Sequence, residues 1–180
     1  MKCGESDGRN DEYEENYSEE KFFRMLIPQK KPLIIDIGAH FGESVEFFYS
    51  IFPGADICSV EPDPESYAKL LKMFPRSSKK TINAAVGAKA GTMTFYQYDK
   101  SHLNSLYAIN KDSKDSLGYA ESCKEKKVDV RCLSLDDLIT EMDIVGQRID
   151  LLKIDAQGGE LDILTCGQKT LQNVQNITLE

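Results

Sequence analysis

The part of the sequence that most constrains the fold is residues 33–43, a short apolar run that is interrupted only by Asp36 and continues into a glycine turn. Apolar residues at helical spacing follow at once: Val45, Phe48, Tyr49 and Phe52. This order predicts a buried strand, a tight loop and a helix. Gly38 and Gly42 would let the backbone turn sharply, and the free N–H groups of the new helix would point toward the same place. We therefore expect a small-molecule site at this loop.

A first strand, glycine turn and helix of this kind can bind a dinucleotide or another adenosine cofactor. The dinucleotide pattern would need glycine at positions 38, 40 and 43, but the sequence has His40 and Glu43. A glutamate in the first helical turn would repel a pyrophosphate, which disfavours an NAD-dependent oxidoreductase. S-adenosylmethionine has no phosphate, and its ammonium and sulfonium groups suit an acidic cleft. We expect this cofactor, with Asp36 placed for its cationic end.

A second acidic position supports this interpretation. Glu61 ends a predicted strand at residues 57–60 and lies 23 positions beyond Gly38. In doubly wound folds the acid that binds the ribose lies about 20 residues beyond the glycine turn. We therefore interpret Glu61 as the acceptor of hydrogen bonds from the two ribose hydroxyls.

Six short blocks of sequence follow one another between residues 33 and 180: 36–42, 61–64, 83–87, 104–106, 135–138 and 152–160. In this order they resemble the FkbM-type methyltransferases, a branch of the class I S-adenosylmethionine-dependent enzymes. The resemblance implies a doubly wound, Rossmann-like α/β fold with a mostly parallel sheet, and O-methylation of a sugar or another small hydroxylated metabolite. It also implies a set of cofactor-binding residues: Asp36, Gly38, Ala39, His40, Gly42, Glu61 and Pro62. Two positions differ from the family pattern. His40 stands where Asn or Gly is more usual, and Gln157 stands where many members of the family have Glu.

The candidate catalytic residues follow the apolar segment 149–154, which we expect to be a central parallel strand. Asp155 stands at its carboxyl end, where reacting groups gather in open α/β sheets. A hydroxyl acceptor must lose its proton, and Asp155 is the best-placed candidate base, with Glu160 next. Stabilisation of a turn or binding of the cofactor are the alternative roles of Asp155. No histidine pair or carboxylate cluster marks a metal site, so none is expected.

Length and composition limit the domain organisation of the chain and the classes of partner that it can have. A chain of 180 residues fits one domain, and its first 20 residues hold eight acidic and two basic side chains with little to bury. We expect a disordered acidic leader at 1–20 and a methyltransferase domain at 21–180. The net charge of −8 argues against a nucleic-acid partner, and no apolar run reaches the roughly 20 residues of a membrane helix. We expect a cytoplasmic protein with a small-molecule acceptor.

Further elements are expected as a helix at 19–27, strands at 81–86, 92–98 and 128–133, and helices at 64–74 and 134–142. Residues 99–127 have few apolar anchors. A segment of this length inside a compact domain indicates a lid over the acceptor or plain disorder, and we favour the lid.

The last predicted strand, 176–180, corresponds to the fifth strand of the family, whereas the class I fold normally has two further strands. Without them the fifth strand is an exposed edge that can pair with another chain. We therefore expect possible self-association through this edge. The same observation leaves a second hypothesis open, in which a truncated fold serves as a non-catalytic cofactor-binding or interaction module.

Overall fold

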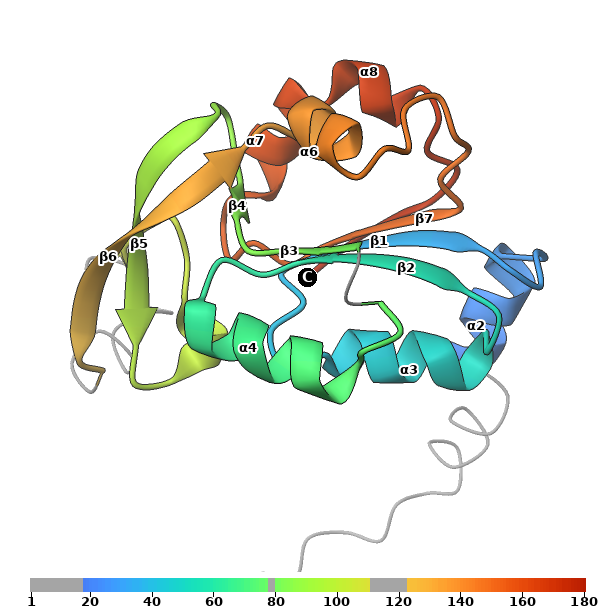
Figure 1. The fold of residues 1–180 in the computed structure, drawn as a ribbon, viewed down its shortest axis with the longest axis horizontal. Coiled ribbons are helices and arrows are strands. Elements are labelled where there is room, and N and C mark those ends of the chain that lie inside the picture. The colour runs from blue at the N-terminus through green and yellow to red at the C-terminus, as the bar shows by residue number, and fades with distance from the viewer. Residues whose placement is uncertain (1–17, 78–79, 111–122) are drawn as a thin grey trace, which may run out of the picture.

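The computed structural model describes residues 18–77, 80–110 and 123–180, and its main feature is a parallel sheet with helices on both faces (Figure 1). The strands of this sheet run in the order β3-β2-β1-β7-β8. They are β1 (Leu33–Ile37), β2 (Asp56–Val60), β3 (Thr81–Ile82), β7 (Leu151–Ile154) and β8 (Ile177–Leu179). The predicted doubly wound, Rossmann-like fold is confirmed. Within the described residues the sheet ends at β8, so the two further strands of the class I fold are absent from that part of the chain.

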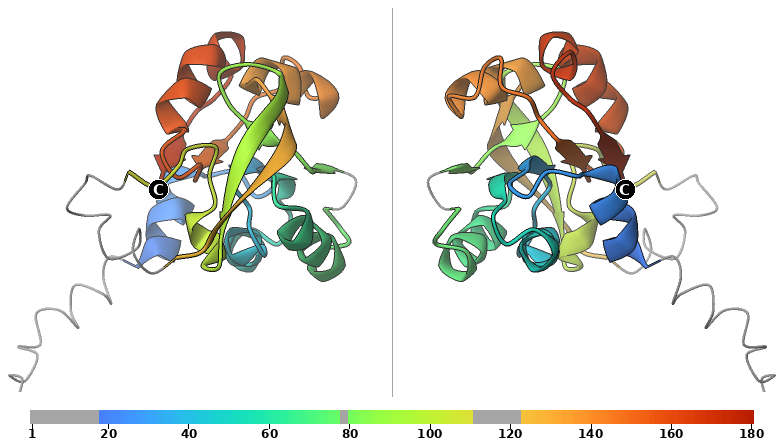
Figure 2. Two further views of the ribbon diagram at one scale, coloured as in Figure 1. Left: turned by 90° about the vertical axis from the view of Figure 1, so that its left-hand side faces the viewer. Right: turned by 90° about the vertical axis from the view of Figure 1, so that its right-hand side faces the viewer.

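The helices divide between the two faces of this sheet (Figures 1 and 2). One face carries α2 (Glu19–Leu26), α3 (Glu43–Ile51) and α4 (Pro64–Met73), and the other carries α6 (Leu135–Glu141), α7 (Glu160–Cys166) and α8 (Gln168–Leu171). In β1, Ile34 belongs to the same hydrophobic cluster as Phe48 on the first face, and Ile35 to the same cluster as Leu138 on the second. Successive side chains of a strand point to opposite faces, which explains why all five residues of β1 are buried.

A second, smaller sheet stands beside the first. In it β5 (Gly91–Tyr98) runs antiparallel to β6 (Glu125–Leu133), and β4 (Ala85–Val86) runs parallel to β6. The prediction of one strand at 81–86 is therefore wrong, because β3 and β4 belong to different sheets. Asn83 separates them: its side-chain amide donates to the carbonyl oxygens of Glu61 and Pro62 at 2.8 and 3.1 Å, which turns the chain away from the main sheet.

The two ends of the described fold concern two expectations from the sequence, the acidic leader and self-association through the last strand. Residues 1–17, most of the expected leader, lie outside the described residues, so the leader stays a prediction. Glu19 and Glu20 form the first turn of α2. At the other end, Ile177 and Leu179 on the edge strand β8 are exposed, and self-association along this edge stays a prediction. Over the ranges that the structure covers, no helix is both long and apolar enough to cross a bilayer.

The order of the strands determines where a ligand can bind. The chain builds β2 and β3 on one side of β1, and β7 and β8 on the other. The loops after β1 and β7 therefore leave in opposite directions, and the crevice between them is the usual ligand site of an open α/β sheet.

We expect Gly42→Ala to destabilise the fold more than Gly158→Ala. Both glycines have a left-handed backbone, with φ of +97° and +102°, which costs an alanine about 1–2 kcal/mol. A Cβ at Gly42 would also lie 2.3 Å from Phe74 Cε2, whereas one at Gly158 would meet nothing within 4 Å. Overpacking should add about 1–3 kcal/mol in Gly42→Ala alone. Urea denaturation measures both, and equal losses would contradict the packing role of Gly42.

Candidate active site

A cavity of about 420 Å³ lies at the carboxyl ends of the central strands. Its volume is within the range of small-molecule sites, about 300–1,000 Å³. The structure brings six of the predicted site residues to its wall: Gly38, Ala39, His40, Glu61, Pro62 and Asp155. They come from the loop after β1, the end of β2 and the end of β7, as expected from the switch in strand order.

The glycine loop is held close to both neighbouring strands. Gly38 has φ of +81°, and a Cβ there would lie 1.9 Å from the carbonyl oxygen of Asp155, so only glycine fits between β1 and β7. The N–H groups of Gly38 and Ala39 donate to the Val60 carbonyl oxygen at 2.9 and 3.1 Å. The loop is thus fixed against the end of β2 before any ligand binds.

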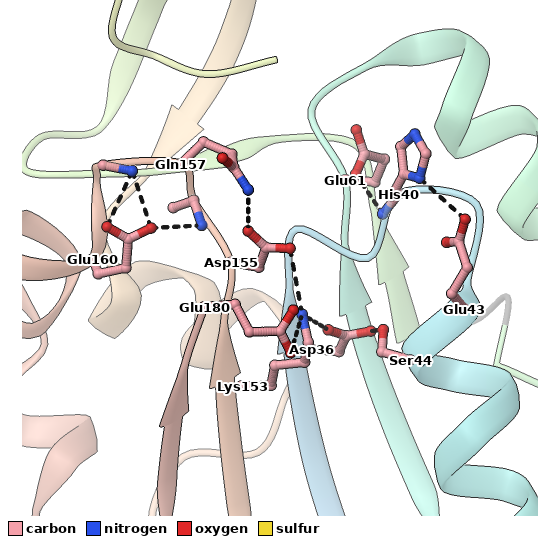
Figure 3. A network of polar contacts seen from close by, with 12 residues as sticks. Asp36, His40, Glu43, Ser44, Glu61, Lys153, Asp155, Gln157, Glu160 and Glu180 are labelled. Carbon is pink, nitrogen blue, oxygen red and sulfur yellow. Dashed lines mark hydrogen bonds and ion pairs between the residues drawn. The ribbon is translucent and has the colours of Figure 1, made fainter. Parts of the chain in front are cut away.

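Glu61 is the most perturbed carboxylate on the wall. Its side chain is buried, at 5% exposure, and it accepts hydrogen bonds from the His40 N–H at 2.7 Å and the Asp63 N–H at 2.8 Å (Figure 3). Burial raises the pKa of Glu61 to about 7, and the two backbone hydrogen bonds oppose this only in part. Each carboxylate oxygen can accept a second hydrogen bond, so Glu61 can still receive ligand hydroxyls.

His40 connects the glycine loop to the segment that was predicted to be a lid. Its Nε2 lies 2.8 Å from Ser101 Oγ, in the short helix η2 (Ser101–Leu103), and its Nδ1 lies 3.3 Å from Glu43 Oε1. Farther along, Ser105 Oγ donates to the Gln157 carbonyl oxygen at 2.8 Å. Residues 101, 102 and 104–106 of the predicted lid segment therefore form part of the cavity wall. Residues 111–122 lie outside the described residues.

A buried lysine on the cavity wall, which the sequence interpretation did not include, lies close to three carboxylates (Figure 3). Lys153 Nζ lies 3.7 Å from Asp36 Oδ1, 3.8 Å from Asp155 Oδ2 and 3.7 Å from Glu180 Oε1. Asp36 is fully buried and also accepts from Ser44 Oγ at 2.6 Å. Burial raises the pKa of Asp36, and the charge of Lys153 opposes that rise. The sequence feature that could have identified this cluster is Lys153 itself, the one charged residue in an otherwise apolar strand.

Three of the predicted site residues do not line the cavity. Asp36, expected at the cationic end of the cofactor, lies behind Ser44 and Lys153. Gly42 packs against Leu70 and Phe74. Glu160, the second candidate base, accepts from the N–H groups of Ala156 and Gly158 at 3.0 and 3.1 Å, so its carboxylate is directed at the loop before its own helix. All three residues make contacts within the protein here, and the expectation that they bind a ligand or react stays a prediction.

Asp155 is the candidate base that does face the cavity. Its backbone N–H donates to the Ile37 carbonyl oxygen at 2.9 Å, and its Oδ1 accepts from Gln157 Nε2 at 2.6 Å. These contacts orient a carboxylate that is one-quarter exposed. Among the residues that the structure describes, no group of three or more His, Cys, Asp or Glu side chains is arranged to hold a metal ion.

Comparison with known proteins agrees with this geometry. A sequence model of the methyltransferase FkbM domain matches residues 36–180. The chain belongs to the FkbM methyltransferase family. The resemblance seen in the sequence is thereby confirmed.

Individual relatives of this FkbM domain are distant. The chain is 26% identical over 160 residues to 2-O-methyltransferase NoeI of Sinorhizobium fredii (strain NBRC 101917 / NGR234), covering 86% of this chain and 65% of that protein. It is also 26% identical over 192 residues to methyltransferase sdnD of Sordaria araneosa, covering 93% and 73%. The crystal structure of methyltransferase FkbM from Methylobacillus flagellatus KT, at 14% identity, has a similar fold, with a TM-score of 0.53 over 83% of this chain and 32% of that one.

The stability of the protein should depend on pH through Glu61. The unfolded chain releases this proton near the ordinary pKa of 4.5, whereas the folded chain keeps it up to about 7. Stability is therefore full below the lower pKa and falls by about 3 kcal/mol as the pH rises through this window. Glu61→Gln removes the titration, so urea denaturation at about pH 5 and about pH 8 should show a smaller loss in the variant than in the wild type. Exposed Glu65→Gln is the control, and equal losses in all three proteins would contradict the assignment.

Lys153→Met should be far more destabilising than Lys80→Met. The first substitution leaves the Asp36 carboxylate buried without its cation, which costs about 3–5 kcal/mol. Lys80 pairs with Asp56 on the surface, where an ion pair contributes about 0–1 kcal/mol. Thermal and urea unfolding of the two variants measure this difference. Similar stabilities would show that the buried cluster does not depend on the lysine.

Proposed function

We propose that this FkbM domain is an S-adenosylmethionine-dependent O-methyltransferase that acts on a small hydroxylated acceptor such as a sugar. The observation that carries the proposal is the position of Glu61, whose carboxylate lies on the wall of a cavity at the switch point of the sheet, next to the glycine loop. The family is one of methyltransferases, and one relative carries the name of a 2-O-methyltransferase. The chain spans 65% of the length of that relative, so its substrate is not carried over.

The residues on the cavity wall fit the proposed donor. Glu61 would accept hydrogen bonds from the two ribose hydroxyls, as the buried acid at the end of the second strand does in doubly wound folds. Gly38 and Ala39 line the cavity, so a bound ligand would lie against the backbone of the glycine loop. Carboxylates elsewhere on the wall suit a ligand that carries positive charge, and the described residues of the wall include no basic cluster that would suit a pyrophosphate.

The proposed reaction asks the protein for alignment and for removal of one proton. The donor supplies an electrophilic methyl group. Asp155, at the end of β7, would accept the proton of the acceptor hydroxyl, while the wall formed by residues 101–106 holds the acceptor and excludes water. Alignment of two bound reactants can supply much of the rate of such a transfer.

We expect S-adenosylmethionine to bind saturably and Glu61→Ala to weaken this binding about 10- to 100-fold, because two hydrogen bonds to a charged group are lost. Isothermal titration calorimetry with S-adenosylmethionine and with NAD measures the affinity and its specificity. Glu65→Ala, an exposed glutamate of α4, is the matched control and should bind as the wild type does. Binding of NAD, or indifference to Glu61→Ala, would contradict the proposal.

Methyl transfer is then assayed with S-adenosylmethionine that carries a labelled methyl group and with methyl glycosides of common hexoses and pentoses as probes. Labelled products support the transferase. Saturable binding without transfer to any probe would favour the second hypothesis, a cofactor-binding module without catalysis.

A further inference from the structure

The chain takes a strained conformation shortly after β7. Gln157 has a φ of +50°, in the left-handed region that residues other than glycine rarely adopt. Within the described ranges only His40 and Asp143 share this feature among the non-glycine residues, and of the three His40 and Gln157 line the cavity. Strained backbone persists where surrounding contacts hold it, and it is concentrated at functional sites. The contacts of Gln157 therefore indicate what the strain serves.

The backbone of Gln157 is held by the part of the cavity wall that contains Ser105. Ser105 is 3% exposed, and its Oγ donates to the Gln157 carbonyl oxygen at 2.8 Å. Ser105 is fixed in turn by β5, because its N–H donates to the Tyr96 carbonyl oxygen at 3.1 Å and its carbonyl oxygen accepts from the Tyr96 N–H at 2.8 Å. The smaller sheet thus holds the loop after β7 in its strained conformation.

In this conformation the side chain of Gln157 turns back onto the candidate base. Its Nε2 donates to Asp155 Oδ1 at 2.6 Å, as Figure 3 shows. The other oxygen of the carboxylate, Oδ2, lies 3.8 Å from Lys153 Nζ. The Asp155 carboxylate is therefore held by an amide at one oxygen and faces an ammonium group with the other. Since a carboxylate has about four lone-pair positions, an acceptor hydroxyl can still donate to it.

We propose that Gln157 is a positioning residue, whose amide holds the Asp155 carboxylate in the orientation that receives the proton of the acceptor. The inference rests on the proposed function, in which Asp155 is the base. In the transfer the acceptor O–H bond breaks, its proton goes to Asp155, and an electron pair of the oxygen forms the new C–O bond. The C–S bond of the donor breaks, and its electron pair stays on sulfur. A base that is displaced by about 1 Å can lose about a hundredfold in rate, so its orientation matters.

Two substitutions remove the amide in different ways. Gln157→Met keeps a side chain of similar length without a hydrogen-bond donor, whereas Gln157→Gly removes the side chain and relieves the strain, because glycine adopts positive φ readily. With a methyl glycoside as the acceptor probe, each should lower kcat about tenfold and leave the KM for S-adenosylmethionine within about twofold. An interaction that serves the reacting group alone changes these two constants in this way.

Thermal unfolding separates this role from a purely structural one. Gln157→Gly should unfold at the temperature of the wild type or higher, even though its kcat falls, because the substitution relieves strain. The control is Gln147→Met at an exposed glutamine, whose amide lies 3.5 Å from the Asp143 carbonyl oxygen and which does not line the cavity. It should leave kcat unchanged. Unchanged kcat in both Gln157 variants, or losses that only follow the loss of folded protein, would overturn the proposal.

The hydrogen bond itself can be observed without turnover. In NMR spectra of the ¹⁵N-labelled protein, the Gln157 side-chain amide proton that faces Asp155 should lie downfield of its partner, and this separation should shrink in Asp155→Ala. The side-chain amide of Gln147 in the same spectra is the control and should not move. A Gln157 amide that does not respond to Asp155→Ala would contradict the contact on which the proposal rests.

The outcomes separate the two proposals. A wild type that transfers methyl groups at a rate that neither Gln157 variant lowers would overturn the positioning role and leave the proposed function intact. A folded wild type that binds no S-adenosylmethionine, or that methylates none of the glycoside probes, would count against the proposed function and would remove the positioning role with it.

Discussion

A charge buried in the central strand governs the organisation of this protein. Asp36 lies in the middle of β1 with no exposure to solvent, and an isolated carboxylate in such a place is very costly. Ser44 from α3 and Lys153 from β7 compensate it. These contacts join β1 to the helix α3, which covers one face of the sheet, and to the neighbouring strand β7. The lysine in turn holds Asp155, so the group that stabilises the core also sets the position of the candidate base.

The switch in strand order places this cluster next to the glycine loop. The close approach of Gly38 to the Asp155 carbonyl oxygen brings the ends of β1 and β7 together, and Val60 of β2 accepts two N–H groups from the same loop. Glu61 and Asp155 are far apart in the sequence but line the same cavity. The candidate cofactor site and the candidate base are thus positioned by backbone contacts between neighbouring strands.

Much of the fold was predictable because its signals are local. The apolar strand, the glycine turn and the helical spacing after Gly42 identified β1 and α3, and Asp63 and Ser134 begin α4 and α6 as expected of N-cap residues. The single strand expected at 81–86 was wrong because two side-chain hydrogen bonds of Asn83 compete with the sheet. Those partners lie more than twenty residues away, and local patterning carries no information about them.

For the site, the sequence by itself determined which residues stand at strand ends and which loop is rich in glycine, because these follow from hydrophobic patterning and spacing. It thereby identified Gly38, Glu61 and Asp155, which the structure places on one cavity. Only the tertiary structure decided the direction of each side chain: Glu160 turns to its own loop, Asp36 turns into the core, and Lys153 becomes the centre of a cluster. The physical reason is that a carboxylate goes where hydrogen-bond donors or cations meet it, and those partners come from other strands and helices.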